Sequence, residues 1–293
     1  MRLKKAIATF AFVLASLSVG ILSTGPARGA ITTQDGLLTA MATATVVNFS
    51  KASLANAVAG QTFSTWTAAG YPTSGATPST WTTVTSSTTG CPAFTNPTSP
   101  ALTYFTSLEL QPVQAATVIV YDRLAHMGGL SGTSTSAQTV SGTIPSGRGA
   151  AVNGSNVEWY LEWYTATGST AATATITYTN QGDTTGRTTT LSLAATQRAG
   201  RAMFILPAAG DYIKSIQSVT LSASTLTAGS FGVTAMRRIA SLSNSMAGTM
   251  ITSKDAFTLG LPLVYDNACV FLMVLCSTTS SGIIQGQFAL SQG

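Results

Sequence analysis

Residues 157–164 read Val-Glu-Trp-Tyr-Leu-Glu-Trp-Tyr, and this stretch decides the class of fold. Its side chains alternate as two sets, Val157, Trp159, Leu161 and Trp163 on one side and Glu158, Tyr160, Glu162 and Tyr164 on the other. Successive side chains of a β-strand point to opposite faces, so this alternation predicts a strand. We expect the first set to lie in a core and the second on a wetter face, because a slip of one residue would exchange the two.

A two-residue period recurs in nine further segments beyond residue 100. They are 104–110, 116–121, 172–179, 188–194, 202–206, 215–221, 229–236, 268–275 and 283–290. Turn residues separate them, as in Asn180-Gln-Gly-Asp-Thr-Thr-Gly186. About ten short strands predict a mostly β protein, an antiparallel β-sandwich or a jelly roll.

The one helical candidate lies within residues 34–59. Apolar and small side chains recur there at helical spacing: Leu37, Leu38, Met41 and Ala42, then Ser53, Leu54, Ala57 and Val58. Because Asn48-Phe49-Ser50 interrupts the pattern, we expect either two short helices or a helix and an arm.

Residues 61–100 are rich in Thr, Ser, Gly and Pro and carry spaced aromatic residues, Trp66, Tyr71, Trp81 and Phe94. A loop of this length is unusual in a compact domain. We therefore expect the aromatic residues to pack on the chain's own sandwich or on a neighbouring subunit. The predicted organisation is a leader at 1–30, a short helical N-terminal arm with the Ser/Thr/Pro/Gly-rich segment at 31–100, and a β-sandwich domain at 101–293.

The leader has the layout of an export signal. Arg2, Lys4 and Lys5 precede the uncharged apolar run 6–22, and small residues follow at Ala27 and Gly29. A secretory signal and an N-terminal assembly arm are the two interpretations. Neither predicts a membrane span in the mature protein.

Only 8% of the residues are charged, against roughly 25% in an ordinary soluble domain. This composition excludes a coiled coil and a highly charged disordered chain. The net charge of +5 comes mostly from the leader, and the remaining basic residues are scattered, so no nucleic-acid partner is expected. Arg237-Arg238, the one basic doublet beyond the leader, is interpreted as a solvated strand end. A Thr- and Ser-rich surface suits contact with neighbouring proteins, because few charges lose their water on assembly.

The three cysteines do not predict a disulfide framework. Cys269 and Cys276 lie seven residues apart, which places them on opposite faces of one strand, where they cannot bond to each other. Cys91 lies in a Gly-Cys-Pro loop and reaches either of them only through the fold. Buried, unreactive thiols are the favoured interpretation. Because His126 is the only histidine, neither a metal site nor a cofactor is expected.

No catalytic constellation is predicted, so we expect a protein that is not an enzyme. Glu158 and Glu162 are four residues apart, which is about 13 Å along a strand. Glycosidase carboxylates lie about 5–5.5 Å or about 6.5–9.5 Å apart. Asp122 and Arg123 are expected to pair or to cap a loop, with His126 bonded locally, and no Gly-x-Ser-x-Gly motif accompanies them. The outward set Glu158, Tyr160, Glu162 and Tyr164 remains a possible platform for a carbohydrate ligand.

Several phrases of the sequence resemble virion structural proteins of tailed bacteriophages. They are Val120-Tyr-Asp-Arg-Leu-Ala-His-Met-Gly-Gly-Leu-Ser-Gly-Thr133, Ala137-Gln-Thr-Val140, the stretch 157–164, Ser218-Val-Thr-Leu-Ser-Ala-Ser224, Gly229-Ser-Phe-Gly-Val233, Gln287-Phe-Ala-Leu-Ser-Gln-Gly293 and Thr33-Gln-Asp-Gly-Leu37. The resemblance covers roughly residues 31–293 and is strongest to head decoration and minor capsid proteins. It carries no catalytic motif.

The resemblance implies a non-enzymatic structural protein of a bacteriophage virion, a capsid decoration (cement) protein. Its partners would be copies of itself and other virion proteins, such as a major capsid protein. The segment 61–100 and the N-terminal arm are the expected contacts. The alternative is a carbohydrate-binding or adhesive module on a phage tail or a bacterial surface. The expected location is the virion, or else outside the cell or on its surface if the leader is an export signal.

Overall fold

The computed structural model describes residues 30–54, 56–226, 229–248 and 251–293. The predicted leader therefore lies outside the described residues, apart from Ala30. The described chain forms seventeen strands and two short helices, α1 (Gln34–Ala42) and α2 (Ala256–Leu259). No helix in this part of the chain is long and apolar enough to cross a membrane.

The strands form three antiparallel sheets. The six-stranded sheet has the order β14 (Thr252–Lys254), β5 (Thr103–Pro112), β17 (Ile284–Gln292), β1 (Thr45–Lys51) and β3 (Gly70–Tyr71), with β15 (Leu263–Val264) paired to β5. The four-stranded sheet has the order β10 (Arg187–Leu193), β9 (Ala172–Asn180), β12 (Ile213–Leu221) and β7 (Gln138–Thr143). The seven-stranded sheet has the order β11 (Ala202–Phe204), β8 (Glu158–Trp163), β13 (Ser230–Asn244), β6 (Ala116–Ser131), β16 (Val270–Cys276) and β2 (Thr62–Ser64), with β4 (Thr82–Thr83) paired to β6.

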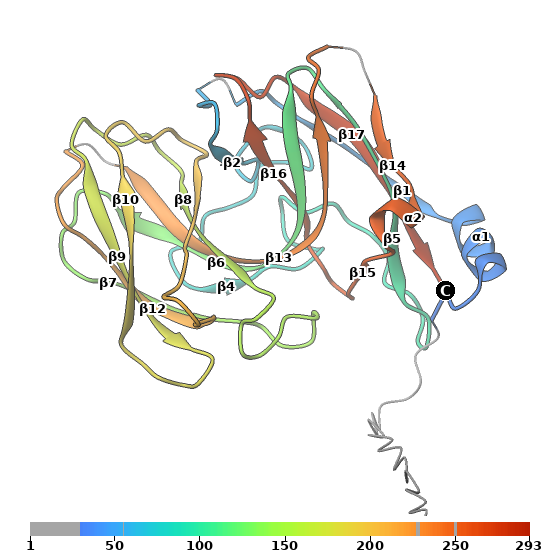
Figure 1. The fold of residues 1–293 in the computed structure, drawn as a ribbon, viewed down its shortest axis with the longest axis horizontal. Coiled ribbons are helices and arrows are strands. Elements are labelled where there is room, and N and C mark those ends of the chain that lie inside the picture. The colour runs from blue at the N-terminus through green and yellow to red at the C-terminus, as the bar shows by residue number, and fades with distance from the viewer. Residues whose placement is uncertain (1–29, 55, 227–228, 249–250) are drawn as a thin grey trace, which may run out of the picture.

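The long strands β6 and β13 connect two sandwiches. In Figure 1 the four-stranded sheet lies at the left and the six-stranded sheet at the right, and β6 and β13 run from one to the other. One hydrophobic core lies between the six- and seven-stranded sheets, and a second lies between the four- and seven-stranded sheets. The predicted mostly β, antiparallel, sandwich-like fold is confirmed, and all ten predicted strands are present.

Strand β8 buries the side chains that the alternation assigns to the core. Trp159, Leu161 and Trp163 are buried in the second core, and Val157 is half-buried at its edge. The second expectation, that the other face of this strand is wet, is wrong. Tyr160 belongs to a third buried cluster, together with Trp66 and Phe271.

Segment 61–100 covers that other face of β8. It contributes β2 and β4 to the seven-stranded sheet. Its own residues Trp66 and Val84 are fully buried in the third cluster. Trp66, Trp81 and Phe94 therefore pack on the chain's own sheets, the first of the two expected arrangements. Tyr71, on the edge strand β3, is 53% exposed. Deleting this segment would remove part of the core, so it is no detachable contact loop.

The helical candidate at 34–59 forms one helix, followed by a strand and a loop. Helix α1 is present and begins at the N-cap Thr33, whose side chain accepts a hydrogen bond from the Gly36 backbone N–H. Residues 45–51 form β1, because the β-branched Thr45, Val46 and Val47 favour a strand and β17 and β3 pair with both its edges. The second helix expected around Ser53, Leu54, Ala57 and Val58 is wrong, since the described residues between β1 and β2 form no helix. Strands β1 and β2 precede residue 101 and pair with β17 and β16, so the sheets extend across the boundary predicted at residue 100.

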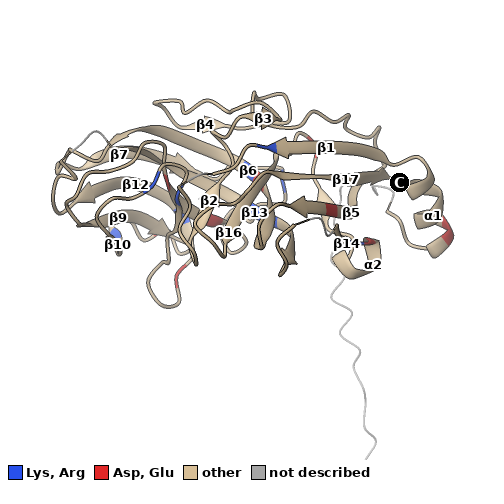
Figure 2. Ribbon diagram, turned by 90° about the horizontal axis from the view of Figure 1, so that it is seen from above, with Lys and Arg blue, Asp and Glu red and all other residues tan. Residues whose placement is uncertain are grey.

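Charged residues are sparse over the whole ribbon (Figure 2). Several of them are nevertheless buried. Asp122 and Arg123 are buried near the middle of β6, and the half-buried Arg237 lies in the middle of β13. The sequence predicts strand ends at these charges, because charged side chains are rarely buried unless paired. The tertiary structure pairs these charges, so β6 continues for 16 residues and β13 for 15. Arg237-Arg238 is therefore not a strand end.

Candidate functional site

The predicted ligand platform on β8 is mostly covered. Glu162 is 1% exposed and Tyr160 is 6% exposed, while Glu158 and Tyr164 are half-buried. The four side chains do point to one face, as the alternation predicts. Because segment 61–100 packs over them, they do not form an open surface, and only Glu158 reaches a groove.

Glu162 forms a buried ion pair with Arg123. Arg123 donates from Nη1 to Oε1 over 2.9 Å and from Nη2 to Oε2 over 2.5 Å, and the Thr234 hydroxyl donates to Oε2 over 2.8 Å. The guanidinium lies 4.3 Å from the centre of the Trp66 ring. Burial alone would raise the pKa of Glu162, but Arg123 and the hydrogen bonds outweigh this effect and lower the pKa to about 2. This carboxylate is therefore charged at neutral pH and bonded within the fold.

His126 lies beside this pair as a neutral imidazole. Its Nδ1 is 2.8 Å from Arg123 Nη2. A guanidinium has no acceptor, so Nδ1 must accept and the ring proton must lie on Nε2. Burial, together with the positive charge of Arg123, lowers the pKa of His126 to about 3 against the opposing effect of Glu162. The ring is held in place by Arg123 and by edge-to-face contact with Trp66, 5.2 Å between ring centres.

We expect the protein to lose stability as the pH falls below about 6.5, the reference pKa of histidine, toward about 3. In this window the unfolded chain binds a proton at His126 and the folded chain does not, so the free energy of unfolding falls by up to about 1.4 kcal/mol per pH unit. Urea unfolding between pH of about 6.5 and about 5 measures this slope without titrating Glu162, whose pKa shift acts only below its reference value of 4.5.

His126→Gln is the control for this prediction, because the glutamine carbonyl can accept from Arg123 without titrating. The slope in this pH window should be reduced in the variant, since His126 is the only histidine of the chain. Equal slopes in the two proteins would contradict the assignment.

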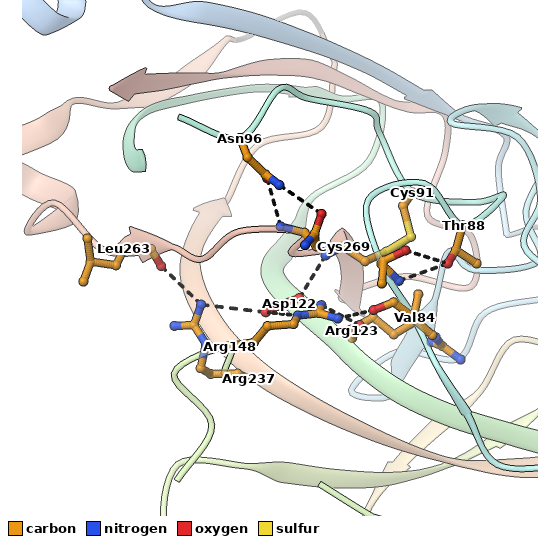
Figure 3. Close-up of polar contacts among 12 residues, drawn as sticks. Val84, Thr88, Cys91, Asn96, Asp122, Arg123, Arg148, Arg237, Leu263 and Cys269 are labelled. Carbon is orange, nitrogen blue, oxygen red and sulfur yellow. Dashed lines mark hydrogen bonds and ion pairs between the residues drawn. A yellow bond between two sulfur atoms is a disulfide. The ribbon is translucent and has the colours of Figure 1, made fainter. Parts of the chain in front are cut away.

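Asp122 forms a second buried cluster at the junction of the two sandwiches (Figure 3). Both of its carboxylate oxygens accept hydrogen bonds from the Arg148 guanidinium, and the backbone N–H of Cys269 donates to Oδ1 over 2.9 Å. Arg237 lies 3.9 Å away. The expectation that Asp122 pairs with Arg123 or caps a loop is wrong, because neighbouring residues of a strand point to opposite faces.

Cys91 and Cys269 form a disulfide that links segment 61–100 to the residue preceding β16. The favoured interpretation of buried, unreactive thiols is therefore wrong for this pair and holds for Cys276, which is free and buried. The two bonded residues are 178 positions apart, and only the fold brings their Cα atoms to 5.2 Å. Burial raises the pKa of the Cys276 thiol to about 11, so this thiol is a weak nucleophile.

A groove of about 560 Å³ opens where β8 begins and β13 runs past it. Its lining includes Glu158, Trp159, Phe204, Leu206, Tyr212 and Arg238. Phe204, Leu206 and Tyr212 are exposed, although aromatic and large aliphatic side chains are usually covered. No periodicity in the sequence marks the groove, because its lining residues come from β8, β13 and the chain around β11.

The groove offers groups that can hold a ligand. Its second carboxylate, Asp211, is fully engaged by Tyr178, Asn180 and Arg187. Among the residues that the structure describes, no cluster of His, Cys, Asp and Glu could hold a metal ion. The described groups can therefore orient a ligand by hydrogen bonds and ring contacts.

A second open surface is the outer face of the six-stranded sheet. Pairing aligns its exposed and half-buried side chains in three rows: Val46, Ala289 and Ser107; Asn48, Gln287, Glu109 and Ser253; Ser50, Gln285 and Gln111. We call this set the amide face. A shallow depression of about 470 Å³ lies across it.

No family model matches the chain, and no curated protein matches it. Among solved structures the chain is weakly similar to the one titled "Crystal structure of infectious bursal disease virus VP2 subviral particle". The two share 12% identical residues over 92% of this chain and 84% of that chain, with a TM-score of 0.19. At that TM-score the similarity carries no argument about the fold or the function of this chain.

Proposed function

We propose that this chain is a non-enzymatic structural protein of a bacteriophage virion, a capsid decoration protein that forms homo-oligomers and binds other virion proteins. The observation that carries the proposal is the amide face. The phrases that resemble phage virion proteins support the virion as its location. The scarcity of charge over the whole molecule supports a role in contact between proteins (Figure 2).

The amide face is suited to pairing with a second copy of itself. Glu109 is the one charged side chain of its three rows, and its carboxylate already accepts a hydrogen bond from Gln287 over 2.7 Å. Asn and Gln side chains both donate and accept, so two such faces can bond without repulsion between like charges. Few ions would lose their water when the contact forms.

The amide face alone is too small for a stable contact, so neighbouring residues must contribute to the interface. Four strands about 4.8 Å apart and rows about 6.6 Å apart give a flat patch of roughly 400 Å² on each copy. A stable contact buries more than about 1,000 Å² in total. Helix α1 packs against β17, a strand of the amide face, and exposes Leu38 and Met41. We therefore include α1 in the proposed contact, which retains the N-terminal arm as a contact element.

The test is the oligomeric state of a variant with charge added to the amide face. Asn48→Arg combined with Gln285→Arg places like charges opposite each other in a symmetric pair, so the oligomer should dissociate to monomers. Sedimentation velocity measures the change. Thr188→Arg combined with Thr190→Arg, on the exposed side of β10, adds the same charge elsewhere and should leave the oligomer intact.

Particle binding tests the virion role separately. Wild-type protein should co-sediment with undecorated phage particles, and mass spectrometry of purified virions should detect it. A wild-type protein that stays monomeric at high concentration and never binds particles would overturn the proposal. Dissociation by both double variants would place the contact elsewhere than on the amide face.

A further inference from the structure

We propose that the groove at the start of β8 is a binding site for a neutral carbohydrate, an oligomer of hexose or N-acetylhexosamine units. The site goes beyond the proposed assembly role and lies away from the amide face. Three features of the groove carry the inference: a carboxylate fixed by two phenols, exposed aromatic rings, and an unpaired guanidinium.

The Glu158 carboxylate is held in place with one oxygen left for a ligand. Tyr121 and Tyr160 both donate hydroxyl protons to Oε2, over 2.7 and 2.8 Å. Burial, with Glu158 nearby, raises the pKa of both phenols, so they remain donors at neutral pH. Oε1 has no hydrogen-bond partner among the described residues and lies on a groove-lining side chain. A hydroxyl group of a ligand can donate to it without displacing any protein contact.

Aromatic rings provide the apolar part of the site. Phe204 is 43% exposed and rests against the Tyr160 ring at 5.5 Å, so the residue that fixes Glu158 also supports this ring. Tyr212 lines the same groove and is 48% exposed. The C–H face of a sugar ring is apolar while its rim is polar, and packing on an aromatic ring buries the first while leaving the second to bond.

Arg238 supplies hydrogen-bond donors to the groove, whereas the Glu158 carboxylate can only accept hydrogen bonds. It is exposed, and no ion pair forms between it and any acid among the described residues. Its neighbour Arg237 is occupied by the Leu263 carbonyl and the Tyr265 ring. One free acceptor of negative charge and one free donor group of positive charge favour a ligand without net charge whose groups both donate and accept. Sugar hydroxyls have this property.

The volume of the groove agrees with an oligosaccharide. About 560 Å³ lies within the range of ligand sites, roughly 300–1,000 Å³. The covered platform of Tyr160 and Tyr164 is thus replaced by a site that keeps Glu158 from β8 and adds Phe204, Tyr212 and Arg238.

The experiment measures binding of chitotetraose, maltotetraose and cellotetraose by isothermal titration calorimetry. At least one of these should bind saturably to the wild-type protein. Phe204→Ala, Glu158→Gln and Arg238→Gln should each weaken that binding at least tenfold, which corresponds to about 1.4 kcal/mol.

Each variant has a matched control outside the groove and the amide face: Phe257→Ala on α2, Asp255→Asn at the N-cap of α2 and Arg198→Gln in an exposed loop. These should bind the same sugar with wild-type affinity. Thermal unfolding of all six variants shows whether each one is folded. Because Arg238→Gln removes only an exposed side chain, it keeps the test valid if Glu158→Gln disturbs the phenols.

Failure of all three sugars to bind overturns the proposal. Binding that the groove variants leave unchanged also overturns it, because the sugar then binds elsewhere. Sedimentation velocity on the same variants separates this result from the assembly proposal, since the groove variants should keep the wild-type oligomeric state whether or not they bind sugar.

Discussion

Replacing Glu162 by alanine is expected to lower the free energy of unfolding by about 3–5 kcal/mol, because removal of one partner leaves a buried charge without compensation. Arg123 is fully buried, and its two guanidinium nitrogens donate to Glu162. Without that carboxylate, the remaining contacts of Arg123 are to His126, Thr234 and aromatic rings. Urea unfolding at neutral pH measures the loss.

A double variant distinguishes the uncompensated charge from the loss of the contact itself. Arg123→Met combined with Glu162→Leu removes both charges and retains much of the volume, so its cost should be far below that of Glu162→Ala. Lys214→Gln breaks the exposed Lys214–Asp183 pair and should change stability only slightly. If the double variant is as unstable as Glu162→Ala, the charge argument is wrong.

Trp159→Ala is the second large change, with an expected cost of about 3–5 kcal/mol. The indole is 1% exposed in the second core and stacks on Trp81 at 5.5 Å. Its Nε1–H donates to the Ile213 carbonyl over 3.0 Å, so the variant also leaves that acceptor without its partner. Because Trp81 belongs to segment 61–100, the cavity would also loosen that segment against the sheet.

Chemical denaturation measures this loss, and Phe257→Ala is the control. Phe257 is an exposed ring on α2, so its removal should stay within about 0.5 kcal/mol of the wild type. A Trp159→Ala protein as stable as the wild type would show that this side chain is not part of a packed core.

The groove and the amide face serve separate roles in these proposals. Glu158, Phe204 and Arg238 gather at the start of β8, and the amide face lies on the six-stranded sheet. A decoration protein with both surfaces would hold its neighbours through one and a glycan through the other. The two sets of variants test these roles independently.

The sequence by itself determined ten of the seventeen strands that the structure describes, among them most of the long ones. Alternation of apolar and polar residues is a local property, and a strand with one buried face needs nothing else to show it. It located all ten predicted strands and the buried set Trp159, Leu161 and Trp163. It missed β1 at residues 45–51, which pairing with β17 and β3 stabilises, and the second helix that it offered around Ser53, Leu54, Ala57 and Val58 is not formed by the described residues.

Only the tertiary structure decided which faces are covered, which charges pair and which cysteines bond. Segment 61–100 lies on the second face of β8, and the sequence of residues 157–164 gives no sign that this face is buried. Arg148 reaches Asp122 and Cys91 reaches Cys269 from distant positions in the chain, so no spacing in the sequence reveals either pair. The groove has the same origin, because Phe204 and Arg238 come near Glu158 only through strand pairing. Periodicity reports the direction of a side chain, whereas burial, ion pairing and ligand sites depend on what the rest of the chain places opposite it.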